Sequence, residues 1–391
     1  MLAFVLLAKM ASVWFYGSRP IQRGWPYDGF LFQLRDRFTD YLIPYAVAGF
    51  HNIYNPTDWA ANKLIPPPYG YFQYALLRYL PFRTSLVVTY GSFLIILASF
   101  IAILWIIYVH NYQFLRPYRL LCFAIFLIAC FPLAFEIDRG NLDLYGALVI
   151  AILYALAQFR GVMNAPMAIL LAMLISLKPS FAIFIIPLVL CIRWSWVLLA
   201  GALVAVNYAW PIVFYGAKPN YLVNLIRSAS TVINGDLYSH NLSSGLLAMG
   251  IHTGTVFDIT LGTCMLFLVV WVRFLIRELD KKRIFLTILT LTVLVTLIVN
   301  APSNDYRLIL LLPAFMALPI LLPNLLSSAV GWHVLAISFV LAFGYTNIPI
   351  PGVFNYFTAL RALSLIVIFL LILWEAKSQA REFDSVDLRP A

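Results

Sequence analysis

The sequence predicts an all-α, polytopic membrane protein, and three observations support this fold class. Hydrophobic residues make up 63% of the 391 residues and charged residues only 11%. The mean hydropathy is +0.91, whereas soluble domains carry about 25% charged residues. The third observation is a series of about twelve apolar runs, many of them near the roughly 20 residues that a helix needs to cross the hydrocarbon core.

Short loops separate most of the predicted spans. The spans lie near residues 1–17, 84–109, 119–136, 142–159, 162–177, 179–192, 196–215, 256–276, 284–301, 306–323, 328–348 and 355–374. The first run contains Lys9 and no small-residue cleavage site before a soluble domain, which favours a membrane helix over a removable signal peptide. Residues 1–375 are expected to form a single transmembrane domain, and residues 376–391 a disordered cytoplasmic tail.

The distribution of basic residues predicts the topology. If the spans alternate from a cytoplasmic N-terminus, twelve Lys and Arg residues lie inside, whereas the outer loops, including 216–255, carry five. Cytoplasmic loops are enriched in Lys and Arg, so we expect both termini inside. The formal net charge of +10 is then explained by topology, and nucleic acid is not an expected partner.

The long first outer loop, residues 18–83, has the composition of a membrane interface. It contains Trp25, Trp59 and eight tyrosines. Tyr and Trp prefer positions where one end of the side chain is apolar and the other is hydrated. We therefore expect short amphipathic helices lying at the outer membrane surface.

Five polar segments fall on the predicted outer face. They are "RDRFTDY" (35–41), "EIDRGNLD" (136–143), "LKPS" (177–180), "SHNLSSG" (239–245) and "SNDYR" (303–307). Ionisable side chains at membrane depth are costly unless they pair with one another or face a water-filled cavity. Their one-sided distribution predicts a functional site at the outer end of the helices.

An ordered series of motifs resembles glycosyltransferase family 87, a group of polytopic GT-C enzymes that use polyprenyl-phosphate sugars. The series is "TDYLIPY", "IPPPYGYF", "DRGNLD", "LKPSFAIFIIPLVL", "HNLSSGLLA" and "PSNDYRLILLLPA". The resemblance covers most of the chain, although many members have Gly-Gln-x-Asn where this chain has Arg139-Gly140-Asn141. It implies a GT-C fold and transfer of a hexose, mannose by default, to a lipid or glycan acceptor on the periplasmic side of the plasma membrane.

The resemblance also implies a catalytic base, one Asp of the first outer loop. Asp40, directly before "YLIPY", is the preferred candidate among the acidic residues of that loop. A positioned carboxylate can accept the proton of the acceptor hydroxyl. The alternative is that Asp40 caps a helix or pairs with Arg35 or Arg37.

The leaving phosphate needs positive charge or hydrogen-bond donors close to it. The candidates for this role are Arg139, Lys178, His240 and Arg307. Further residues expected to bind substrate are Tyr69, Asn141, Asn241, Ser243 and Asp305.

Several of these residues have a purely structural alternative. Arg139 can pair with an acidic neighbour, Asn141 can cap the following helix, and Lys178 can extend to the lipid headgroups. Asp305 and Arg307 flank one residue and can pair with each other.

Two other functions compete with the glycosyltransferase interpretation. One is a transporter or flippase for a lipid-linked sugar, and the other is an oligosaccharide polymerase or ligase. The sequence has no cluster with metal-ligand spacing and no Cys-x-x-Cys pair, so we expect neither a metal nor another cofactor. The expected partners are the sugar donor, the acceptor and membrane lipids, with the protein acting as a monomer.

Overall fold

The computed structural model describes residues 80–130, 132–133, 136, 141, 143–215, 241–299, 305–343 and 353–387. About 89% of this part is helical, and none of it lies in a strand. Five of the described helices are long and apolar enough to cross a membrane. They are α5 (Phe82–Asn111), α8 (Asp143–Arg160), α14 (Thr255–Leu275), α15 (Lys281–Val299) and α20 (Val353–Asp387). The described part of the chain is therefore all-α, consistent with a helical membrane protein, while the count of twelve spans stays a prediction.

Further apolar helices coincide with other predicted spans. They are α6 (Arg119–Ala129), α9 (Asn164–Leu177), η2 (Pro179–Phe184) with α10 (Ile185–Cys191), α11 (Trp194–Tyr215), of which Trp194–Ala209 is the apolar stretch, and α19 (Ala329–Phe343). The predicted first span and the predicted interfacial helices lie outside the described residues.

The predicted span over 306–323 is not one continuous helix, because this segment is broken into short helices. These are η3 (Asp305–Leu311), α16 (Leu312–Met316), α17 (Leu318–Leu321) and α18 (Pro323–Leu326). Pro313, Pro319 and Pro323 each lie in the first two positions of a new helix. Proline has no N–H and clashes with the carbonyl four residues before it, so each one favours a new start over continuation.

The prediction of a disordered tail is wrong over 376–387, because α20 continues to Asp387. A buried carboxylate near this extension explains part of its order. The two carboxylate oxygens of Glu375 accept the backbone N–H groups of Asn324 and Leu325 at 3.1 and 2.9 Å. Gln379, one turn further along α20, donates to the same carboxylate.

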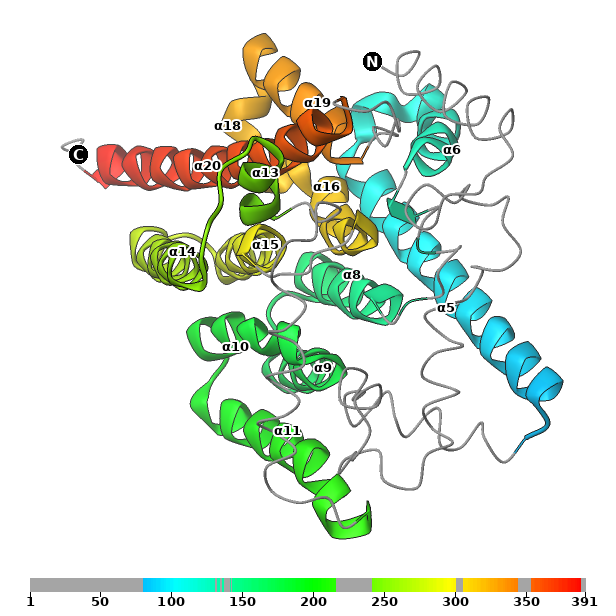
Figure 1. Cartoon of the computed structure of the whole chain (residues 1–391). Coiled ribbons are helices and arrows are strands. Elements are labelled where there is room, and N and C mark those ends of the chain that lie inside the picture. Colours follow the sequence, from blue (N-terminus) through cyan, green and yellow to red (C-terminus); the bar gives the residue numbers. More distant parts are fainter. Residues whose placement is uncertain are drawn as a thin grey trace.

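The helices α8 and α15 form the centre of the bundle (Figure 1). Figure 1 shows α5 along one side of them, α9 to α11 on another, and α20 with α13 (Leu242–Ala248) and α19 on a third. Almost all of α15 is buried. The hydroxyl groups of Tyr154 and Thr290 share a short hydrogen bond that joins α8 to α15.

One close approach near the start of α8 gives a test of this packing. A Cβ atom at Gly146 would lie 2.8 Å from Cε2 of Phe181, whose side chain in η2 is completely buried. We expect Gly146→Ala to lower the free energy of unfolding in detergent by about 1–3 kcal/mol, the usual cost of overpacking. Gly91→Ala in α5 is the matched control, because nothing lies within 4 Å of the added methyl group. Equal stabilities of the two variants would contradict the close contact.

Candidate functional site

A completely buried carboxylate holds two cations at one end of the bundle. Asp143 is the first residue of α8 and is 0% exposed. Lys178 Nζ lies 2.9 Å from Asp143 Oδ1, and Arg307 Nε lies 3.3 Å from Oδ2. The lysine and arginine side chains are only 16% and 10% exposed. Three segments that are far apart in the sequence therefore meet at one charge. We call Asp143, Lys178, Arg307 and the neighbouring Asn141 and Glu136 the Asp143 cluster.

The local sequence explains how Lys178 reaches this position. Lys178 ends α9 with an extended backbone (φ −149°, ψ 144°). Pro179 follows it and disfavours the helical conformation for the residue before it. The lysine therefore lies in a short break between α9 and η2, from which its side chain extends to α8. Arg307 lies in the first turn of η3, the start of the proline-broken segment.

Asn141 takes the structural role considered for it, a helix cap, and also contacts Lys178. Its Oδ1 atom accepts the backbone N–H of Asp143 at 3.1 Å, as in a helix cap. The same atom accepts a hydrogen bond from Lys178 Nζ at 2.8 Å. Asn141 thus satisfies one of the free N–H groups at the start of α8 and also fixes the lysine.

Glu136 places a second buried carboxylate at the start of α8. It is 0% exposed, and its Oε1 atom accepts the backbone N–H of Leu144 at 3.0 Å. The formal charges of the four ionisable residues in the Asp143 cluster sum to zero. Burying a charge without a counter-charge costs several kcal/mol of free energy, so these four side chains can be buried together only because their charges balance.

The cluster retains donors that the described protein does not use. Arg307 Nη1 is buried and has no hydrogen-bond partner in the described part of the chain. A buried polar group without a partner costs about 1–3 kcal/mol, and more when it is charged. A guanidinium fork forms its strongest hydrogen bonds with carboxylate or phosphate oxygens. The arrangement is therefore suited to an anionic ligand that supplies the missing acceptor.

The structure brings together three of the residues singled out in the sequence, Asn141, Lys178 and Arg307. The lysine is largely buried, and its ammonium group is turned toward Asp143. Arg307 also pairs with Asp143. Asp305 begins η3, and its side chain is not described.

Two other candidates have local partners in α13 and α14. Asn241 caps α13, and its Oδ1 atom accepts the N–H of Ser244 at 2.7 Å. The hydroxyl of Ser243 donates a short hydrogen bond to Asp258 in α14. The helix α13 packs mainly against α20 (Figure 1). Asp40, Tyr69, Arg139 and His240 lie outside the described residues.

Sequence reasoning missed Asp143 and Glu136 as members of the site. An acidic residue before an apolar helix is usually taken as a helix cap, which hides a second role. The signal that points to Asp143 is charge balance. No Asp or Glu occurs between residues 144 and 235, so Lys178 has no acidic neighbour in its own segment.

The described residues give no indication of a bound metal. Within them, no group of three or more His, Cys, Asp or Glu side chains is placed to hold an ion. All four cysteines are free.

Comparison of the chain with protein-family models, curated proteins and solved structures finds no match.

Removing the central carboxylate tests how far the site depends on it. Asp143→Asn leaves Lys178 and Arg307 buried beside a neutral amide, and removing one member of a buried ion pair typically costs about 3–5 kcal/mol. We expect a loss of this size in the free energy of unfolding, measured in detergent.

The matched control for this variant is Glu278→Gln. It breaks the ion pair between Arg277 and Glu278, whose side chains are 70% and 59% exposed. Such exposed pairs contribute at most about 1 kcal/mol. If Asp143→Asn were no more harmful than this control, the carboxylate would not be the anchor of the cluster.

Proposed function

We propose that the protein is a membrane glycosyltransferase that moves a hexose from a polyprenyl-phosphate sugar to a lipid or glycan acceptor. The observation that carries this proposal is the convergence of Lys178 and Arg307 on the buried Asp143, with Arg307 Nη1 left without an acceptor. A departing phosphate gains negative charge in the transition state. Cations that are already fixed in place stabilise that charge without reorganising.

The proposed donor site uses N–H groups of Lys178 and Arg307 that are not hydrogen-bonded within the Asp143 cluster. Two contacts of the Lys178 ammonium group go to Asp143 and Asn141, and an ammonium group has three donors. Arg307 contacts Asp143 through Nε, and its Nη1 atom is left for a ligand. A phosphate can therefore bind both cations while Asp143 continues to hold them in place.

The proposed base is Asp40, as the family resemblance implies. A carboxylate with an ordinary pKa near 4 is ionised at neutral pH. It takes the proton of the acceptor hydroxyl while that oxygen bonds to the anomeric carbon. The bond from this carbon to the phosphate oxygen breaks, and the phosphate leaves with the electron pair. A single displacement of this kind inverts the configuration, and the family resemblance supports this outcome and mannose as the sugar.

The distribution of Lys and Arg supports an outer, periplasmic location for this site in the plasma membrane. Asn141, Lys178 and Arg307 all lie next to predicted outer loops. The remaining candidates, among them Arg139, His240 and Tyr69, are proposed to complete the donor and acceptor sites.

One observation favours a second candidate, a transporter of lipid-linked sugars. The segment η3 to α18 is a broken helix buried in the bundle, and transporters often build substrate sites from discontinuous helices. Such a protein would move the donor between leaflets without forming a new glycosidic bond.

The two functions and a polymerase can be separated in one assay. The purified protein is placed in liposomes with a panel of radiolabelled polyprenyl-phosphate hexoses and an extract of membrane lipids as acceptor. A product heavier than the acceptor by one hexose supports the proposal. Addition of a long glycan block identifies a polymerase or ligase, and movement of the sugar lipid without product identifies a transporter.

Two substitutions separate the proposed roles within this assay. Asp40→Asn should lower kcat about 10²–10⁴-fold, the usual contribution of a positioned base, with little change in donor KM. Arg307→Lys keeps the charge but loses the planar fork, so it should mainly raise the KM for the donor. Asp58→Asn in the same loop is the control and should retain activity. Near-normal transfer by Asp40→Asn would reject the assigned base.

A further inference from the structure

A basic pocket lies at the opposite end of α8 from the Asp143 cluster. It has a volume of about 600 Å³ and lies between the last turns of α5, the short helix η1 (Gln113–Tyr118), the start of α6 and the end of α8. Its volume is within the range of about 300–1,000 Å³ that small-molecule sites occupy. Along α8, Asp143 and Phe159 are separated by roughly 24 Å at 1.5 Å per residue. The pocket is therefore separate from the proposed active site.

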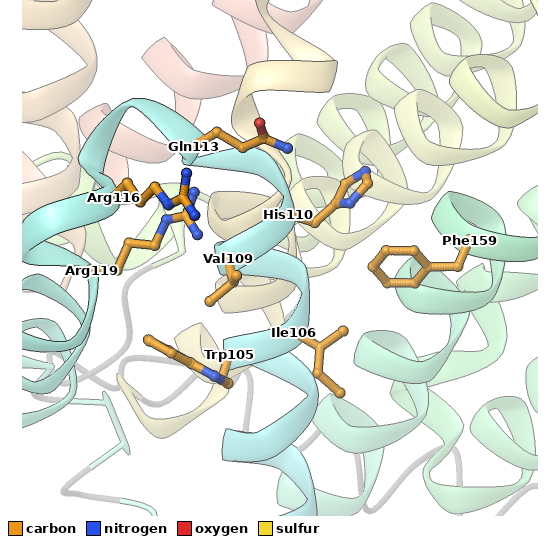
Figure 2. A pocket seen from close by; sticks show the side chains of 8 residues that line it. All are labelled: Trp105, Ile106, Val109, His110, Gln113, Arg116, Arg119 and Phe159. Carbon is orange, nitrogen blue, oxygen red and sulfur yellow. The ribbon is translucent and has the colours of Figure 1, made fainter.

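Two guanidinium groups point into this pocket. Figure 2 shows Arg116 and Arg119 on one side of it, with Gln113 beside them and His110 toward the opposite wall. Arg119 is held by a hydrogen bond from its Nε to the backbone oxygen of Tyr112 at 3.3 Å. Its terminal nitrogens remain for other partners. Gln113 adds an amide that can donate to an oxygen atom.

Among the described residues, no carboxylate balances the positive charge of the pocket. Within the described part of the chain, neither Arg116 nor Arg119 pairs with a carboxylate. The sequence has no Asp or Glu between residues 59 and 135, and α8 has none after Asp143. Two like charges that converge without a counter-charge repel each other. An anion between them would remove this repulsion.

The other walls of the pocket are aromatic and apolar. Trp105, Ile106 and Phe159 line it, and the last two are 51% and 43% exposed at the surface of the helices. The ring of His110 meets Phe159 edge to face, with the centroids 5.0 Å apart. This combination suits a molecule that carries a phosphate next to an apolar part.

We propose that this pocket binds the phosphate group of an anionic phospholipid. Basic pockets between transmembrane helices on the cytoplasmic side bind phosphate headgroups of lipids. The sequence predicts that Arg116 and Arg119 lie in a cytoplasmic loop. The phosphate accepts hydrogen bonds from both arginines, and the glycerol and chains pass over Ile106 and Phe159 toward the membrane.

Control of topology alone does not explain these features. It requires basic residues in inner loops, and Lys281 and Lys282 at the start of α15 satisfy it without lining this pocket. It does not require two guanidinium groups to share one concave space with an aromatic wall. This proposal does not depend on the glycosyltransferase function.

The test measures lipid binding by the full-length protein in detergent. Native mass spectrometry and the shift in Tm are recorded with phosphatidylglycerol, with phosphatidylcholine, and with inorganic phosphate as a soluble source of the same group. The variants are Arg116→Gln, the double variant Arg116→Gln/Arg119→Gln, and the charge-matched control Lys281→Gln/Lys282→Gln. Arg116 is exposed, so its replacement leaves folding intact even if the double variant is unstable.

We expect one saturable site for phosphatidylglycerol in the natural protein and in the lysine control, with little binding of phosphatidylcholine. Each arginine replaced should weaken binding roughly tenfold, the loss of one charge-assisted hydrogen bond. Saturation by inorganic phosphate, sensitive to the same arginines, would support a phosphate site filled from solution. Equal binding by the natural protein and the arginine variants, or an equal loss in the lysine control, would overturn the proposal.

Discussion

A single buried carboxylate constrains the structure at one end of the bundle. Asp143 is fully enclosed, and a carboxylate in such surroundings needs a counter-charge or must give up its own charge. Lys178 and Arg307 supply that counter-charge from segments 35 and 164 residues away in sequence (178 − 143 and 307 − 143). The ion pairs of Asp143 therefore hold three segments together: the start of α8, the break after α9 and the start of η3. A buried ion pair does not guarantee stability, but it does require these three segments to meet.

The two ends of α8 then differ in a way that is relevant to function. At its start, positive and negative charges are balanced and tightly packed, and Arg307 keeps a donor for a ligand. Near its end, Arg116 and Arg119 surround a pocket with no carboxylate partner in the described structure. The first arrangement suits stabilisation of a developing charge by fixed groups. The second suits occupancy by a permanent anion, such as the phosphate of a lipid. The closed core around α8 and α15 separates the two sites.

Much of the helical framework could be predicted from the sequence. Long apolar runs such as those of α5 and α15 must form helices in a bilayer, because only a helix satisfies the backbone hydrogen bonds within the segment. Asn141, Lys178 and Arg307 were recognisable as polar residues in apolar surroundings. Asp143 was not, because a helix cap explains an acidic residue at that position equally well and pairing across 164 residues leaves no local pattern. The break at Pro313 and Pro319 was missed because hydropathy measures the polarity of side chains and contains no information about the backbone N–H that proline lacks. Near the extension of α20, Glu375 meets Asn324, a tertiary contact that composition does not reveal.

A double-mutant cycle between Asp143 and Arg307 tests the central claim most directly. The free energies of unfolding in detergent are compared for the natural protein, Asp143→Asn, Arg307→Gln and the combined variant. Residues in one ion-pair network show coupling energies of about 0.5–3 kcal/mol, whereas independent sites add within about 0.5 kcal/mol. The structure predicts a coupling above about 1 kcal/mol, with the combined variant less damaged than the sum of the single ones. Strict additivity would show that the carboxylate and the guanidinium group do not hold each other in place.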